Sequence, residues 1–242
     1  MHTPTIIFTP KERISHILML NSFFMPDIGL YQGQIGVVLA MSKLFKQTKN
    51  EVFSDFHYDL LEIVIEKINK ELPLSLNNGL SGIGWGIEYL IQNGFVEGKS
   101  VEICEEIDHR IMETDPRRMT DLSLETGFEG LLHYIVYHLQ GAMMQKTRLP
   151  FDNAYLSDIY SVCKTLSNKS VSNKSVSNSL KSLSEVYTLF VEQKRFPDYQ
   201  FQVIDFATNV PELQFDKLTT YPLGLNNGLA GMLLHLLERE KA

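Results

Sequence analysis

Four glycine-rich segments each present a pair of adjacent side chains that could bind a ligand or take part in chemistry. The segments follow the pattern Gly/Ser-Leu-x-x-Gly-x-x-Gly and lie at residues 29–36, 75–82, 123–130 and 224–231. The x-x pairs at their centres are Tyr31-Gln32, Asn77-Asn78, Glu125-Thr126 and Asn226-Asn227. Most of these side chains are neutral hydrogen-bonding groups, which suit a peptide backbone or another polar neutral ligand.

Glu125 is the only carboxylate among these pairs, so it is the candidate general acid or base. A solvated carboxylate near the positive end of a helix explains it equally well. The other pairs also have a plain alternative, because Asn and Thr are common helix N-caps. Trp85, the only tryptophan, lies among glycines just after the second block. It is a further candidate ligand-binding residue if it lines the same opening, and a core residue otherwise.

The blocks recur at a regular period, which indicates a repeat architecture. Their central glycines are 46, 48 and 101 residues apart, and the last interval is close to two periods. A degenerate repeat is therefore expected near residue 177, where a polar low-complexity loop at 167–179 precedes a helical pattern. This fourth repeat has the helix but not the glycines.

Apolar spacings of i, i+3, i+4 and i+7 after the blocks predict that each block opens a buried helix. Between the blocks, residues 61–72 and 102–113 show one apolar face and one charged face, as outer helices do. The sequence therefore predicts an all-α fold of about five helical hairpins. The only strand candidates are residues 5–8 and 199–203, and both are short.

The glycines themselves have two explanations. Glycines three apart at a helix start let a neighbouring helix or a ligand approach the backbone, because they carry no Cβ. They also leave first-turn N–H groups open to whatever lies in front of the helix. Close packing between repeats is the structural explanation, and we expect Gly79 and Gly228 to be intolerant of a side chain for that reason.

The blocks at 75–82 and 224–231, with their Asn-Asn-Gly-Leu sequences, resemble the inner-helix motif of the lanthionine synthetase C-like family. The resemblance implies an α/α toroid, in which a ring of inner helices lies inside a ring of outer ones. Full-length members have seven helix pairs, so the five expected here imply a tightened ring, an incomplete toroid or half of a dimer. The α/α-toroid glycosidases are a less close alternative.

The cyclases of this family use zinc to hold a peptide thiolate that adds to a dehydrated Ser or Thr. Their zinc ligands are two cysteines and a histidine, and an adjacent Cys-His pair precedes the glycine of one inner-helix motif. The corresponding positions here are Asn226-Asn227, or Asn77-Asn78 in the second block. A carboxamide is a poor zinc ligand, so the resemblance implies that the metal site is absent. We therefore expect no metal and no cofactor.

Other chemistry has weak support in the sequence. Cys104 and Cys163 both occupy apolar helix faces and read as core residues, and His133 and His138 lie on different sides of one helix. Seven histidines form no recognised metal-binding spacing. The sequence from Gly82 to Gly86 has no preceding strand and is not a phosphate loop.

Composition limits the partners and the location. The formal charge of −7 argues against nucleic acid, which requires a clustered positive surface. No stretch is long and apolar enough for a membrane helix, and two cysteines make no disulfide framework. We therefore expect a single domain over residues 1–242 in a reducing cytoplasm, with no membrane association.

Two functions from different classes remain. The first is a zinc-free pseudoenzyme that binds a peptide or a modification enzyme in ribosomal-peptide modification. The second is an enzyme with non-metal acid/base chemistry centred on Glu125, which is either peptide cyclase-like or glycosidase-like. A homo-oligomer is compatible with both.

Overall fold

The computed structural model describes residues 8–168, 176–195, 201–207, 212 and 214–239, and these are helices joined by loops. No strand occurs in this part of the chain. Residues 5–7 and 199–200 of the two strand candidates lie outside it, as does most of the polar loop at 167–179. Val203, at the end of the second candidate, begins a short 3-10 helix.

The chain divides into two compact units, residues 1–67 with 202–242 and residues 68–201. The helices of the first unit are α1 (Pro10–Asn21), α2 (Gln34–Thr48), α3 (Glu51–Glu66) and α10 (Leu229–Arg239), with 3-10 helices η1 (Ser22–Phe24), η3 (Val203–Phe206) and η4 (Phe215–Thr220). The helices of the second are α4 (Leu80–Gln92), α5 (Ser100–Ile103), α6 (Glu105–Met112), α7 (Phe128–Gln145), α8 (Asn153–Asn168) and α9 (Asn178–Gln193), with the 3-10 helix η2 (Pro116–Arg118).

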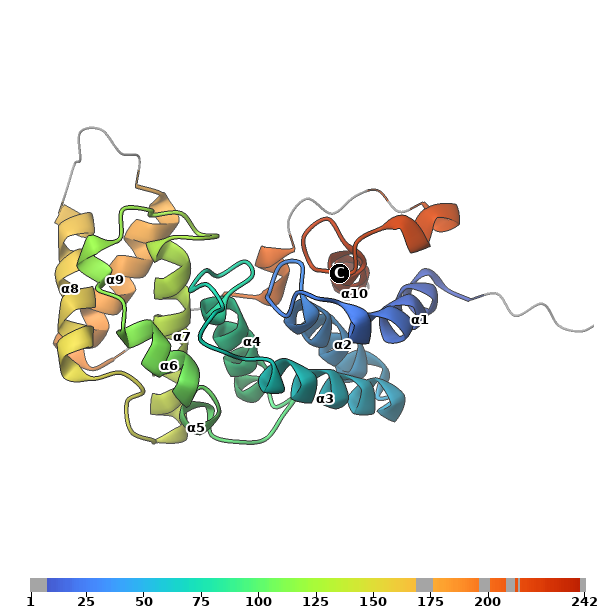
Figure 1. The fold of residues 1–242 in the computed structure, drawn as a ribbon, viewed down its shortest axis with the longest axis horizontal. Helices are drawn as coiled ribbons and strands as arrows, with labels where there is room; N and C mark the ends of the chain where they lie inside the picture. Colours follow the sequence, from blue (N-terminus) through green and yellow to red (C-terminus); the bar gives the residue numbers. More distant parts are fainter. Residues whose placement is uncertain (1–7, 169–175, 196–200, 208–211, 213, 240–242) are drawn as a thin grey trace, which may run out of the picture. The chain divides into compact units, whose positions relative to one another are not determined.

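In the first unit, α2 is the central helix. It packs against α3 on one side and against α10 on another, and α1 packs on α10 (Figure 1). Consecutive residues of α2 from Gln34 to Ser42 are buried, so this helix has no solvent-facing side over that length. The first and last parts of the chain therefore share one core.

In the second unit, α4, α7 and α9 form the inner layer. α7 packs against both α4 and α9, and α8 covers α9 (Figure 1). The outer helices α5 and α6 pack against α7 and α4, respectively. Every residue of α4 from Leu80 to Ile91 is buried, whereas α6 buries Ile107, Asp108 and Ile111 along one face.

The predicted all-α fold with buried inner helices and amphipathic outer ones is confirmed. Each glycine-rich block immediately precedes an inner helix, and α9 is the inner helix of the block that lacks glycines. The limits of one outer helix differ from the prediction, because α3 begins at Glu51 and ends at Glu66. The apolar residues Ile68 and Leu72 therefore lie in the loop that follows. Among the described residues, no helix has the length and apolar character needed to cross a membrane.

Candidate functional site

Each glycine-rich block folds back on itself just before its helix. The first helical N–H donates to the carbonyl seven residues earlier, with distances of 2.8 to 3.0 Å: Gln34 to Asp27, Leu80 to Pro73, Phe128 to Asp121 and Leu229 to Pro222. Our expectation that first-turn N–H groups stay open to a ligand is therefore wrong at this position. The loop carbonyls satisfy the donors that a helix start would otherwise leave unpaired.

In the first three blocks, the x-x side chains do not cap the helices, although capping was one of the two explanations for them. Gly33, Gly79 and Gly127 are the N-cap residues of α2, α4 and α7, and none of the three helices has a side-chain cap. In these three blocks the x-x residues precede the cap. Their side chains are therefore not committed to the helix ends.

Two kinds of neighbouring atoms leave no room for a Cβ at these glycines. A Cβ at Gly79 would meet the carbonyl oxygen of Pro73 in its own loop and lie 2.8 Å from the Ser75 nitrogen. A Cβ at Gly130 would meet the Leu124 carbonyl and also lie 2.7 Å from the Leu76 Cβ of the adjacent block. The central glycine thus allows the loop to fold closely against the helix start. The last glycine allows this as well, and it also allows the adjacent block to pack closely.

In the second unit, the blocks at 75–82 and 123–130 are joined through their backbones. The Glu125 carbonyl accepts hydrogen bonds from the N–H groups of Leu76 at 2.9 Å and Asn77 at 3.0 Å. This bonding holds the Asn77-Asn78 and Glu125-Thr126 pairs beside each other. We call these four residues the polar rim.

The polar rim offers several groups to a ligand. Asn78 Oδ1 accepts from Ser75 Oγ at 2.8 Å, and Asn77 Oδ1 accepts from the Asn78 N–H at 2.8 Å, so both amides use their oxygens internally. Thr126 donates its hydroxyl to Asp121 at 2.6 Å. The exposed Glu125 carboxylate makes no hydrogen bond or ion pair with the part of the chain that the structure describes. The rim therefore presents amide donors beside a carboxylate acceptor.

The first unit contains the equivalent contact between its two blocks. The Asn226 N–H donates to the Tyr31 carbonyl at 3.0 Å, and Gln32 Nε2 donates to the Asn226 carbonyl at 2.8 Å. A Cβ at Gly36 would lie 2.9 Å from Leu225 Cγ, as Gly130 meets Leu76 in the other unit. The last block is therefore bonded to the first as the second is bonded to the third.

The eight predicted x-x residues thus form two sets, one in each unit, and each set is brought together by backbone hydrogen bonds. Gln32, Asn78, Glu125, Thr126 and Asn227 are exposed, and Asn77 and Asn226 are partly so. Tyr31 does not fit the prediction of a solvent-facing ligand residue, because it is buried with its ring 6.0 Å from that of Phe206.

Of the two possibilities for Trp85, the structure supports the core residue and not the candidate ligand-binding residue. The indole is fully buried and stacks on the rings of Tyr89 and Tyr137, each with a centroid separation of 5.3 Å. An aromatic stack of this kind is a core feature of α4 and α7. Trp85 is therefore a core residue and has no exposed surface to offer a ligand.

The second unit contains a buried ionic cluster that the sequence pattern does not predict. His138 on α7 lies between two carboxylates, with Nδ1 2.5 Å from Glu88 Oε2 on α4 and Nε2 3.0 Å from Asp108 Oδ2 on α6. Tyr134 donates its hydroxyl to Asp108 Oδ1 at 2.7 Å, and Gln92 Nε2 donates to Glu88 at 2.9 Å. The Glu88, Asp108 and His138 side chains are at most 4% exposed.

Burial and hydrogen bonding act in opposite directions on this cluster. Burial disfavours a charged ring, but the hydrogen bonds to Asp108 and Glu88 outweigh it and raise the pKa of His138 to about 9. Burial raises the pKa of Asp108, and the hydrogen bonds from His138 and Tyr134 only partly offset this. The only available signal in the sequence was Glu88, the single charged residue in the apolar run from Leu80 to Gln92.

His133, five residues earlier on α7, has a different environment from His138. Burial lowers its pKa to about 4, and its ring centroid lies 4.4 Å from that of Phe201. It is therefore neutral at physiological pH. The prediction that the two histidines lie on different sides of the helix agrees with these contacts.

Comparison with known proteins decides the family. The model of the lanthionine synthetase C-like proteins matches residues 24–190, which is more than half of the chain and includes the first three glycine-rich blocks. The chain belongs to the lanthionine synthetase C-like family. No curated protein and no solved structure matches it.

The zinc site of the cyclases in the lanthionine synthetase C-like family does not fit the residues of this member. The block positions that the resemblance assigns to a thiolate and an imidazole carry the carboxamides of Asn226 and Asn227. Both cysteines are buried and free, and burial is the main cause of the raised pKa of each thiol. The described residues contain no group of three or more His, Cys, Asp and Glu that could hold a metal ion. Within this part of the chain, the donor set required for a zinc-bound thiolate is therefore not assembled.

Proposed function

We propose that this lanthionine synthetase C-like protein is a zinc-free peptide-binding or scaffolding partner in ribosomal-peptide modification. The observation that carries the proposal is the polar rim, where two blocks are fixed by the Glu125 carbonyl and the side chains of Asn77, Asn78 and Glu125 face outward from it. Amide donors beside a carboxylate match the alternating carbonyl and N–H groups of an extended peptide.

The charge distribution suggests which peptides suit the rim. Glu125 and the neighbouring Asp121 are both exposed, and the whole chain carries a formal charge of −7. Such a surface attracts neutral or basic peptides and repels acidic ones. Two free cysteines with raised thiol pKa values are compatible with a reducing cytoplasm, where such a partner would be made.

The alternative, acid/base catalysis at Glu125, lacks support from the geometry of this site. Catalytic carboxylates are commonly tuned by burial or by a second titratable group. The Glu125 side chain is exposed, and no titratable side chain within the described residues bonds to it. Catalysis centred on this residue is therefore the weaker proposal.

Fluorescence anisotropy with three labelled peptides of equal length, one neutral, one basic and one acidic, tests the proposal. We expect the neutral or basic peptide to bind, and the double variant N78A/E125Q to bind at least about tenfold more weakly while remaining folded. Glu106→Gln on α6 is the matched control, since it also removes an exposed carboxylate but lies outside the rim. Equal binding by the parent and the double variant would refute the proposal that the polar rim binds the peptide.

The genes beside the one that encodes this chain give an independent test. A neighbouring gene for a precursor peptide or a dehydratase would agree with the proposal. That peptide would then replace the model peptides in the anisotropy measurement.

A further inference from the structure

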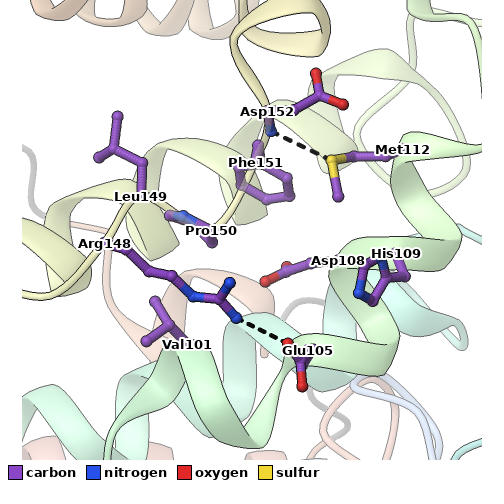
Figure 2. Close-up of a pocket in the computed structure, with 10 residues that line it drawn as sticks. All are labelled: Val101, Glu105, Asp108, His109, Met112, Arg148, Leu149, Pro150, Phe151 and Asp152. Atoms are coloured by element: carbon purple, nitrogen blue, oxygen red, sulfur yellow. Dashed lines mark hydrogen bonds and ion pairs between the residues drawn. The ribbon is translucent and has the colours of Figure 1, made fainter.

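A pocket of about 230 Å³ lies in the second unit, on the outer side of the buried ionic cluster. Its walls come from α5, α6 and the loop that joins α7 to α8 (Figure 2). Val101, Pro150 and Phe151 supply apolar surface, and Glu105, Asp108 and Arg148 supply charge. Figure 2 shows the Asp108 carboxylate extending from α6 toward the space between Arg148 and Phe151.

Asp108 connects the pocket with the buried cluster behind it. Its two oxygens accept from the Tyr134 hydroxyl and the His138 ring, and a carboxylate has further lone pairs that these two bonds do not use. The side chain is only 4% exposed, so a ligand that reaches it must occupy the pocket. The other groups packed around the cluster are Glu88 and Gln92 from α4 and Cys104, which is a neutral thiol.

The hydrogen bonds determine how many protons the cluster holds. His138 meets a carboxylate oxygen at each ring nitrogen, so both contacts are good only if both nitrogens carry a hydrogen or if a carboxyl group is protonated. With His138 as imidazolium and both carboxylates ionised, the buried cluster has one negative charge in excess. A buried excess charge is costly unless another group compensates it.

Arg148 does not supply this compensation in the structure. Its guanidinium pairs with Glu105 at 2.7 Å, and its side chain is 71% exposed at the edge of the pocket. The position next to Asp108 is therefore open to a cation from outside. The pocket is large enough for one small cationic group and not for a folded segment.

We propose that this pocket binds a guanidinium or primary ammonium group, with the Asp108 carboxylate as its counter-charge and Phe151 against its apolar part. The cationic group belongs either to a small free molecule or to an arginine or lysine side chain of a peptide. The site is separate from the polar rim, so either proposal stands if the other fails.

Binding should be linked to protonation of Asp108. Because burial raises the pKa of this carboxyl, acid neutralises it earlier than an exposed aspartate, and a bound cation has the opposite effect. The affinity should therefore fall as the pH is lowered through the Asp108 titration.

Backbone amide shifts in the ¹H–¹⁵N spectrum of the whole chain provide the test, with methylguanidinium as the probe. N-methylurea is the control ligand, because it has nearly the same shape and no charge. We expect saturable shifts at Asp108, His109 and Phe151 with the cation, and at least about tenfold weaker binding of the urea. Acetyl-arginine amide, compared with methylguanidinium, distinguishes a peptide side chain from a small free molecule as the ligand.

Two variants decide whether the charges act as proposed. Asp108→Asn should weaken methylguanidinium binding at least about tenfold. Arg148→Gln should strengthen it several-fold, because it removes a competing positive charge and releases Glu105. Arg110→Gln is the control for Arg148→Gln, since Arg110 on α6 also carries a positive charge, pairs with Glu113 and does not line the pocket.

Four results would overturn the proposal: equal binding of N-methylurea, unchanged binding by Asp108→Asn, no strengthening in Arg148→Gln, or equal strengthening in Arg110→Gln. If Asp108→Asn fails to fold, the pair Arg148→Gln and Arg110→Gln still decides the question, because both replaced side chains lie on the surface.

Discussion

The buried cluster makes the stability of this protein depend on pH in a direction that can be worked out from His138. The pKa of this ring is about 9 in the folded protein, against an ordinary value of 6.5. Between these values the folded state holds a proton that the unfolded state releases. The stabilisation is therefore complete below pH 6.5 and is lost as the pH rises to about 9.

The size of the effect follows from the shift. Each unit of pKa corresponds to about 1.4 kcal/mol, so the loss between pH 6.5 and 9 is about 3 kcal/mol. For a chain of this size, a change of that magnitude lowers the melting temperature by roughly 6 to 12 °C. The raised pKa of Asp108 acts in the same direction but at lower pH, because there too the folded state holds its proton longer.

His138→Gln tests this reasoning, since glutamine can hydrogen-bond to the carboxylates but cannot titrate. At pH 6.5 the variant should lose about 3 to 5 kcal/mol, the usual cost of breaking a buried ion pair. Urea unfolding of parent and variant at pH 6.5 and 9 measures both effects. The parent-minus-variant difference should shrink by about 3 kcal/mol at the higher pH, and a difference that stays constant would show that the two carboxylates do not raise the pKa of His138.

Three further predictions concern the glycine-rich blocks. Gly79→Ala should cost roughly 1 to 3 kcal/mol in urea unfolding, because its Cβ meets the Pro73 carbonyl, and a variant as stable as the parent would contradict the loop geometry. Asn227 has φ of 57°, so Asn227→Ala should cost about 1 kcal/mol and Asn227→Gly clearly less; equal costs would refute a backbone origin. Elemental analysis of the purified protein should find less than one zinc per chain, and a stoichiometric, tightly held zinc would overturn the zinc-free proposal.

The sequence predicted those parts of the fold that depend on local patterns. The spacing of glycines and apolar residues located the inner helices α2, α4, α7 and α10, because a buried helix start and a 3.6-residue period are both visible in a short window. The apolar face of Cys104, Ile107 and Ile111 was located in the same way, and all three side chains are buried, although Cys104 lies between α5 and α6 and not within one continuous helix. The end of α3 was less certain, since apolar residues continue into the loop.

The buried cluster could not be predicted by the same reasoning. Glu88, Asp108 and His138 lie on three helices, and their contact depends on the rotation of each helix about its axis. A shift of one residue in any of them would turn the side chain away from the other two. The closing of the first helical N–H by the loop was missed for a related reason, because the bond between Leu80 and Pro73 depends on the path of a loop that has no periodic pattern.

The two units together show why the blocks can keep their structure while the side chains at their centres differ. The carbonyl that accepts the inter-block hydrogen bond belongs to Glu125 in one unit and to Tyr31 in the other, and these side chains have little in common. The bond is made by the backbone, and the glycines that allow it contribute no functional group. Blocks with different x-x side chains can therefore keep the same inter-block bond, so a glycine-rich block identifies the architecture and cannot by itself identify the chemistry. For this chain, the two proposed sites therefore rest on the particular side chains of the polar rim and on the charges around Asp108, and not on the glycine pattern.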